Sequence, residues 1–233
     1  MTPETKMDAA IALVRGLGVP QFGWIWKSQK WYHKAIGWCL GKIGNPGYMS
    51  SYWTTFRYTV GRPSEAQFGM EDEWTVFCHE GVHALDAKRI TFPLFALIFG
   101  LPQVLALLAV PLAVLLVLLT HSFLGLLGLL ALVFLAPLPA PGRVLLELRG
   151  YKVSMACDFW YYGCPIDSQA YLAAYLEPFI GGGYYFMGTL FKSYIQKELE
   201  GYFNELKAGR GYQGDVYLTA VRDMALRFAN QDQ

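Results

Sequence analysis

Residues 77–86 read Phe-Cys-His-Glu-Gly-Val-His-Ala-Leu-Asp, and the HExxH pattern inside them organises the interpretation of the whole chain. On a helix, residues four positions apart lie on one face, so His79 and His83 can direct both imidazoles at one ion. Glu80 lies beside the first histidine and can take a proton from a water that the ion activates. The alternative is a structural helix with two partly buried histidines.

HExxH supplies two ligands, whereas a catalytic zinc usually has three from the protein. The only later histidine is His121, which lies inside an apolar run, so a carboxylate is the expected third ligand. Glu147 is the only acid in residues 87–157 and has leucines on both sides, where a carboxylate needs a partner. The sequence therefore predicts three ligands for Zn²⁺: His79, His83 and Glu147.

Two of these assignments have alternatives in the sequence. Glu147 can instead pair with Arg143 or Arg149 on a helix surface. Asp86 follows His83 by three residues and can orient a ligand imidazole from behind, or lie on the helix surface.

HEGVH followed by a glutamate on a later helix resembles the gluzincin metallopeptidases. The layout is similar to HtpX-like membrane metallopeptidases, which also place a hydrophobic hairpin between HExxH and the glutamate helix. The resemblance covers roughly residues 50–155. That family usually shows ExxxD or ExxAD after the ligand, whereas residues 147–151 here read Glu-Leu-Arg-Gly-Tyr, without an aspartate.

The resemblance implies a zinc-dependent endopeptidase that hydrolyses peptide bonds through a zinc-bound water, with Glu80 carrying the proton to the leaving amine. A second electrophile should help to hold the oxyanion. Three tyrosines qualify by residue type: Tyr151, Tyr184 and Tyr185. Two other function classes stay open. One is a non-catalytic membrane structural or assembly protein on the same scaffold, and the other is a membrane-surface module built on the aromatic N-terminal segment.

Composition supports a membrane protein of one domain. The 233 residues are 54 % hydrophobic and only 16 % charged, and the mean hydropathy is +0.28. The net charge of +1 makes no case for nucleic acid. The cysteines form no CxxC pair, and we interpret all four as reduced and buried, with a Cys157–Cys164 bridge as the alternative.

Residues 90–142 contain no charged side chain, and only Thr-His-Ser at 120–122 interrupts their apolar character. A membrane span needs about 20 apolar residues, so the pieces at 92–119 and 123–138 predict an inserted transmembrane helical hairpin. Prolines are expected to kink the first piece. The alternative is an apolar hairpin buried among neighbouring subunits of an assembly.

Lysines and arginines flank this hairpin on both sides and are missing from its turn, which places the catalytic part on the cytoplasmic side of the membrane. The two ends of the hairpin return to one face, so the HExxH helix and the Glu147 helix can lie side by side. His121 then lies in the far turn, about 30 Å from the metal.

The N-terminal part, residues 1–48, predicts amphipathic helices at 7–18 and 24–43. The second helix combines tryptophans and lysines without acids, which is typical of a membrane interface; the alternative is a helix that covers the core. Residues 52–60 are rich in aromatic and β-branched side chains and predict a strand. The family resemblance implies that this strand pairs with an extended substrate at the cleft edge, whereas an ordinary hairpin strand is the alternative.

The expected fold class is mainly α (α+β), a gluzincin-like zinc-binding domain with a small sheet or edge strand. The HExxH helix is expected at 71–89. Residues 143–233 should contain the glutamate-ligand helix and the C-terminal helices at 169–179, 184–207 and 215–230, with Asp167 or Ser168 as an N-cap.

Overall fold

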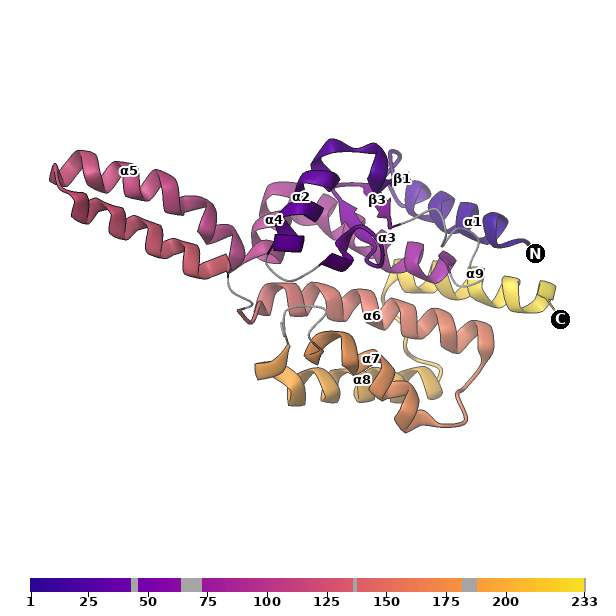
Figure 1. Ribbon diagram of the computed structural model, residues 1–233. Coiled ribbons are helices and arrows are strands. Elements are labelled where there is room, and N and C mark those ends of the chain that lie inside the picture. The colour runs from indigo at the N-terminus through magenta and orange to yellow at the C-terminus, as the bar shows by residue number, and fades with distance from the viewer. Residues whose placement is uncertain (43–45, 64–72, 136–137, 182–187, 233) are drawn as a thin grey trace.

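The computed structural model describes residues 1–42, 46–63, 73–135, 138–181 and 188–232. This part of the chain is mainly helical and carries one small three-stranded sheet, which confirms the predicted fold class at that level (Figure 1). The α-helices are α1 (Pro3–Gly16), α2 (Trp31–Lys42), α3 (Glu73–Ile90), α4 (Phe92–Gly100), α5 (Ala109–Thr120), α6 (Pro141–Tyr162), α7 (Ser168–Ile180), α8 (Lys192–Lys207) and α9 (Val216–Asp232). The 3₁₀ helices are η1 (Lys27–Gln29), η2 (Pro46–Tyr48), η4 (Gln103–Leu108), η5 (Phe123–Leu135) and η7 (Thr189–Phe191).

The helices α3 and α6 lie side by side at the centre of the body (Figure 1). α1 and α9 pack on this pair and form one apolar cluster with it, which includes Val14, Phe77 and Phe228. A second cluster joins α6 to α7 and α8 through residues such as Met155 and Phe203. Because α6 contributes to both clusters, the helix that carries Glu147 is held from two sides.

The sheet has the strand order β1-β3-β2, so β2 (Thr54–Phe56) is an edge strand. It runs antiparallel to β3 (Thr59–Arg62), with Thr55 opposite Val60. The prediction of one strand over 52–60 is therefore wrong in its extent. The chain reverses between the two strands, where Arg57 adopts a left-handed backbone conformation with φ = 60°.

The predicted helix over 24–43 is also wrong at its start, because β1 (Gly23–Trp26) pairs in parallel with β3 and α2 begins only at Trp31. Tryptophan and isoleucine favour strands. The Arg62 guanidinium fixes this arrangement, since it lies 4.6 Å from the ring of Trp24 and 4.8 Å from that of Trp26. Arg62 also forms a buried ion pair with Glu73 at the start of α3.

The C-terminal helices largely follow the prediction. Asp167 caps α7 by accepting hydrogen bonds from the backbone N–H groups of Gln169 and Ala170. The predicted start of the next helix, residues 184–187, lies outside the described residues, and α8 itself begins only at Lys192, after a 3₁₀ turn. All four cysteines are free, but the expected burial is wrong for Cys39 and Cys164, which are exposed.

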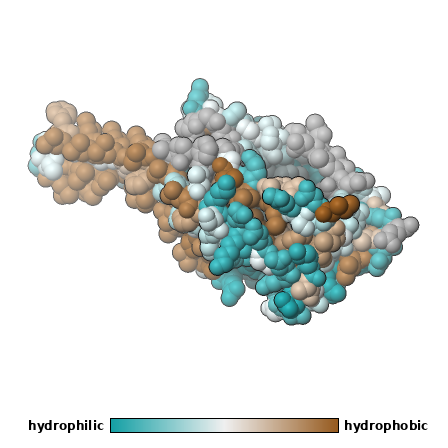
Figure 2. Space-filling model, turned by 90° about the horizontal axis from the view of Figure 1, so that it is seen from below, coloured by the Kyte–Doolittle hydropathy of each residue, from teal (hydrophilic) through white to brown (hydrophobic). Residues whose placement is uncertain are grey.

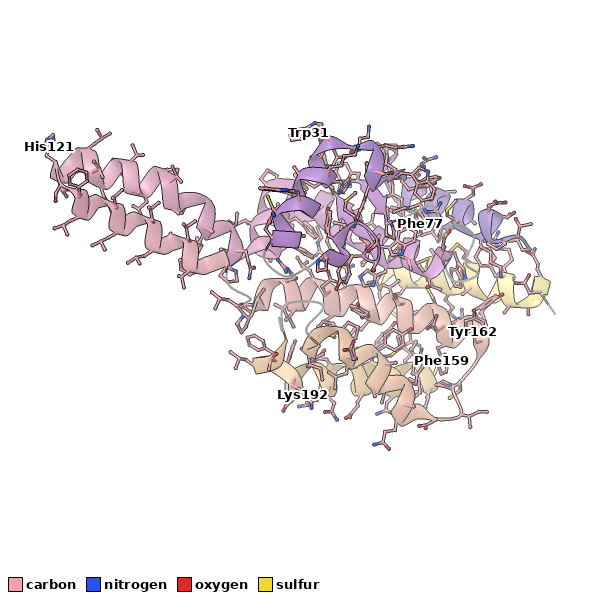
Figure 3. The ribbon with its side chains drawn as sticks, viewed as in Figure 1. Trp31, Phe77, His121, Phe159, Tyr162 and Lys192 are labelled. Atoms are coloured by element: carbon pink, nitrogen blue, oxygen red, sulfur yellow. The ribbon has the colours of Figure 1, made fainter. Side chains whose placement is uncertain are left out.

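Residues 103–135, which form η4, α5 and η5, leave the body as an apolar hairpin that we call the projection (Figure 1). Its surface is hydrophobic along its length, whereas the body carries many hydrophilic side chains on the face seen in Figure 2. His121 lies at its tip, as predicted (Figure 3). The apolar piece at 92–119 was expected to be kinked by prolines, and it is interrupted at Pro102, which has no backbone N–H to donate.

Among the described residues, no helix combines the length and the apolar character needed to cross a bilayer.

Candidate metal centre

The motif lies on a helix that is buried on almost every side. In α3 the apolar side chains of Trp74, Phe77 and Val82 are 1 % exposed or less, and they face α1, α6 and α9. Glu73 in the first turn and basic residues in the last turn complement the helix dipole. Core packing thus holds this part of the backbone, and the two histidines project from it toward α6.

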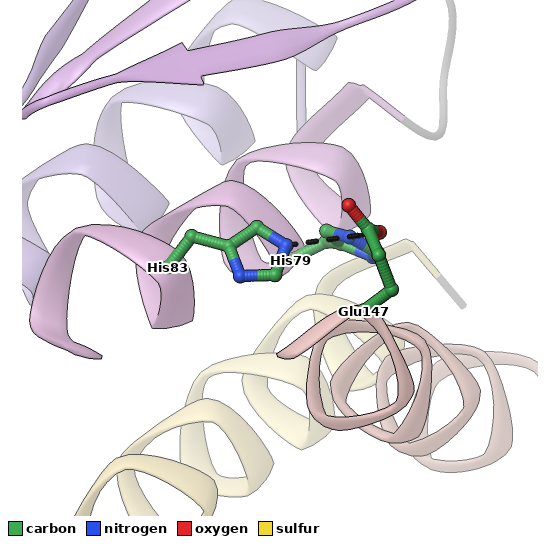
Figure 4. Close-up of side chains that lie close together, drawn as sticks. All are labelled: His79, His83 and Glu147. Atoms are coloured by element: carbon green, nitrogen blue, oxygen red, sulfur yellow. Dashed lines mark hydrogen bonds and ion pairs between the residues drawn. The ribbon is translucent and has the colours of Figure 1, made fainter. Parts of the chain in front are cut away.

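His79, His83 and Glu147 meet between α3 and α6 (Figure 4). The Nε2 atom of His79 lies 3.3 Å from Glu147 Oε2, and the Nε2 atom of His83 lies 3.8 Å from the same oxygen. The potential ligand atoms of the three residues all lie within 4.8 Å of one another. The side chains come from two helices, and His79 and Glu147 are 68 residues apart in the sequence.

The three residues fit a metal ion. Ligand atoms about 2.0–2.1 Å from a tetrahedral ion lie about 3.3–3.4 Å from each other, close to the separations seen here. Both ring nitrogens of His83 are buried without a hydrogen-bond partner in the described chain, and His83 is only 3 % exposed. A buried imidazole without partners is costly, and coordination would satisfy one of its nitrogens.

The charges of the cluster suit a cation as well. Burial by itself would raise the pKa of Glu147, but the hydrogen bond from His79 and the nearby imidazole of His83 hold its pKa far below the usual range. Burial would lower the pKa of His83, yet the neighbouring carboxylates, Glu147 first among them, raise it. Glu147 is therefore ionised between two imidazoles, which is the state that a metal ligand requires.

The alternative of an ion pair between Glu147 and a nearby arginine is wrong. Arg149 forms an ion pair with Asp86, and its Nη2 atom lies 3.6 Å from Asp215 Oδ2. Arg143 donates from Nε to the Phe99 carbonyl at 3.0 Å. Both arginines contact other groups, and the Glu147 carboxylate faces the two histidines.

Asp86 is buried and does not lie on the helix surface, so that alternative is wrong. Its Oδ1 atom pairs with Arg149 of α6, whereas Oδ2 has no hydrogen-bond partner in the described part of the chain. Nor does a hydrogen bond join Asp86 to His83 there. Asp86 thus links α3 to α6 through Arg149, and its action on His83 is electrostatic.

Two residues of α6 that the sequence did not single out support His79. Ser154 Oγ lies 3.2 Å from His79 Nδ1, the nitrogen that faces away from Glu147. Gly150 allows the ring to approach, because a Cβ atom at this position would lie 2.5 Å from His79 Nε2. Gly150 follows Glu147 by three residues and Ser154 follows it by seven, so Glu147, Gly150 and Ser154 lie on one helix face. This spacing is the signal that could have identified them.

Glu80 is held by the edge strand. Thr55 Oγ1 of β2 lies 2.5 Å from Glu80 Oε2 and donates a hydrogen bond to it. Because the neighbouring strand β3 covers only one side of β2, this contact joins the exposed edge of the sheet to the motif helix. No local sequence pattern predicts the Thr55–Glu80 contact, since the two residues lie 25 positions apart.

A buried lysine stands behind this strand. The Nζ atom of Lys27 donates to the carbonyl oxygens of Tyr48 and Tyr52 and to Thr54 Oγ1, at 2.7, 2.5 and 3.0 Å. Burial lowers the pKa of Lys27 to about 7, and the charge of Glu80 opposes this shift. The ammonium therefore fixes the chain just before β2 and at the first residue of the strand, and it contributes positive potential at Glu80.

The remaining predicted site residues are tyrosines. The Tyr151 ring packs edge-on against the His79 ring, with a centroid distance of 4.9 Å, so Tyr151 does lie at the cluster. Tyr184 and Tyr185 lie outside the described residues. On the other side of the cluster, the rings of Phe95 and Phe99 of α4 lie 6.1 and 6.2 Å from that of His83 and provide an apolar wall.

Comparisons with protein-family models, curated proteins and solved structures gave no match for this chain.

Proposed function

We propose that the protein is a membrane-anchored, zinc-dependent metalloendopeptidase of the gluzincin type. The convergence of His79, His83 and Glu147 in one buried cluster carries this proposal. Two imidazoles and a carboxylate suit catalytic zinc, but the same donor set is also used by iron(II) enzymes. The adjacent Glu80, which HExxH hydrolases use as a base, favours zinc and hydrolysis over iron chemistry.

The chain's own residues divide the work as follows. A bound zinc ion would supply Lewis-acid polarisation of a peptide carbonyl and would acidify a water at the site. Glu80 accepts the proton of the attacking water on its carboxylate and delivers it to the leaving amine. Thr55 holds Oε2 of that carboxylate, and Ser154 holds the ring of His79. Of the three candidate tyrosines, Tyr151 is the one within the described residues, and it would act as the second electrophile.

A peptide substrate agrees with the position of β2. Its outer edge has no strand partner in the described part of the chain, and an extended peptide can pair with such an edge. Because Thr55 of this strand reaches Glu80, a peptide bound there would run past the proposed base.

We further propose that the projection anchors the protein in a bilayer, with the metal centre on the cytoplasmic side. Its side chains are exposed and apolar, for example Phe123 at 88 % and Leu119 at 69 %. The 13 residues of η5 extend about 26 Å, most of the roughly 30 Å of a hydrocarbon core. Lys88 and Arg89 before the projection and Arg143 after it agree with a cytoplasmic body.

A second candidate is a non-catalytic membrane protein on the same scaffold. The observation in its favour is the closure of the cluster, since Glu80 and Glu147 are only 7 % and 6 % exposed. A substrate would need better access than these values provide. In this case the metal would stabilise the α3–α6 pair, and Glu80 would have no chemical role.

Replacing Glu80 with Gln separates the two candidates. The peptidase proposal predicts an unchanged metal content and a loss of peptide hydrolysis of about 100-fold or more, because the amide cannot accept the proton. The assay uses detergent-purified protein with an unfolded protein substrate and a chelator control. If neither protein hydrolyses any substrate although both are fully loaded, the scaffold function stands. Equal, chelator-resistant rates for wild type and variant would assign the hydrolysis to a contaminant and also overturn the peptidase proposal.

A further inference from the structure

The helix α2 carries tryptophans and lysines on a face that points away from the body. Trp31 and Trp38 are 79 % and 67 % exposed, and Lys34 and Lys42 are exposed as well. These four positions follow one another at intervals of three or four residues, so they share one side of the helix. The Lys42 ammonium lies 5.9 Å from the Trp38 ring. We call these four residues the α2 face; Trp31 points outward in Figure 3.

The opposite side of α2 is fixed to the body. His33 is fully buried, and its Nδ1 atom lies 2.7 Å from the Tyr48 hydroxyl. Gly37 allows close packing, since a Cβ there would lie 2.6 Å from Met49 Cγ. The helix is therefore held in place by its inner side, and the α2 face is left for a partner outside the described chain.

The α2 face lies next to the root of the projection. The Tyr32 ring of α2 packs on Phe56 at 5.3 Å, and Phe56 packs on Phe92, the first residue of α4, at 5.5 Å. Figure 1 shows α2 and α4 at the end of the body from which the projection extends. A bilayer that receives the projection would thus come close to α2.

The charge of this region has one sign. Residues 9–64 contain seven lysines and arginines and no acid. Lys30, directly before α2, and Arg57, next to Phe56, are also exposed and add to the positive potential of this end of the body. A surface that carries exposed cationic side chains, from a segment without acidic residues, complements a negatively charged partner.

We infer that the α2 face binds the headgroup region of an anionic bilayer beside the inserted projection. Indole rings prefer the level of the headgroups, and lysines are attracted to anionic lipid within a Debye length of the surface. Tryptophans and lysines share one face here, and this combination suits the surface of an anionic bilayer. A single exposed aromatic residue would not indicate such a partner. The inference rests on the proposed membrane anchorage and is independent of the peptidase activity.

The chain provides its own labelling sites for a test. Cys39 on α2 and Cys164 after α6 are exposed thiols, whereas Cys78 and Cys157 are buried. The 22 residues of α6 extend about 33 Å from the root of the projection, so Cys164 lies at the far end of the body. Full-length protein is labelled with a solvatochromic dye at Cys39 in a Cys164→Ser variant and, as a control, at Cys164 in a Cys39→Ser variant. Both are reconstituted in nanodiscs of phosphatidylcholine with or without phosphatidylglycerol.

The emission of the dye at Cys39 should shift to the blue in the anionic nanodiscs, and this shift should be larger than in phosphatidylcholine alone. The emission of the dye at Cys164 should not shift. Lys34→Gln with Lys42→Gln should lower the ratio of docked to undocked α2 on the order of tenfold. Removing the exposed charges of Lys207 and Arg210, at the C-terminal end of α8 and just after it, is the matched control and should change nothing.

Four results would overturn the inference, the last of them together with the anchorage. In the first, the dye at Cys39 shows the emission typical of water although the protein has entered the anionic nanodiscs. This result would leave the anchorage intact and contradict the docking of α2. An equal shift of the dye emission in both lipid mixtures would show that α2 does not prefer anionic lipid. A shift that grows with protein concentration in detergent would assign the α2 face to a second copy of the chain. Failure of the protein to enter nanodiscs at all would overturn the anchorage and this inference together.

Discussion

Gly150 of α6 lies directly against the imidazole of His79 of α3, and a methyl group at position 150 would stand 2.5–2.8 Å from three atoms of that ring. The missing side chain allows the two helices that carry the ligands to approach closely enough for Glu147 to reach both histidines. The absence of a side chain is thus part of the proposed metal centre.

The Gly150→Ala variant should therefore lose metal affinity. The added methyl group displaces His79, and we expect zinc binding to weaken roughly 10- to 100-fold, as for other residues that orient a ligand. Affinity is measured by competition with a chromophoric chelator. The control is Gly201→Ala on α8, where a Cβ meets nothing within 4 Å. Unchanged affinity in Gly150→Ala, with the fold intact, would contradict the close packing described here.

Thr55 should matter for turnover and not for the metal. Thr55→Val keeps the shape but removes the hydrogen bond to Glu80, so we expect kcat to fall roughly 10- to 100-fold with unchanged zinc content. Thr55→Ser keeps the hydroxyl and should restore most of the rate. Steady-state kinetics on all three proteins checks this. Equal losses in the Val and Ser variants would show that Thr55 acts by packing alone.

Lys27 should make stability depend on pH in the neutral range. Its pKa is about 7 in the folded protein and 10.5 as an ordinary lysine, so between these values the unfolded state binds more protons. The free energy of unfolding should then rise as pH increases from 7 to 9. In Lys27→Met this part of the slope should disappear.

Urea titrations at pH 7, 8 and 9 for both proteins provide the measurement. The comparison stops at pH 9 because tyrosines begin to titrate above it. Parallel curves for wild type and variant would mean that Lys27 keeps an ordinary pKa despite its burial.

The sequence contained enough information to predict that His79, His83 and Glu147 form one cluster. His79 and His83 share a helix face by their spacing, and Glu147 is a lone carboxylate among apolar residues, so each of them signals its role locally. The structure brings them together as predicted. The helices around them were also recognisable, because capping residues such as Asp167 act within a few positions of the chain.

The contacts that support the ligands could not be predicted in the same way. Thr55 reaches Glu80 from a strand, and Ser154 and Gly150 reach His79 from another helix, so these pairs depend on tertiary packing. The strand Gly23–Trp26 carries too short an alternation to outweigh the lysine-rich helical pattern that follows it, so the sequence alone favours helix there. Sheet pairing with β3 decides its conformation.

The metal content of the purified protein tests the central claim most directly. Wild type is compared with Glu147→Ala and with Glu198→Ala, which removes an acid of α8 whose ion-pair partner is Lys152 and not a residue of the cluster. After reconstitution with zinc and removal of the excess, elemental analysis should find about one zinc per chain in wild type and in Glu198→Ala, and little in Glu147→Ala. Wild-type protein without zinc, or Glu147→Ala with a full zinc content, would contradict the three-ligand centre.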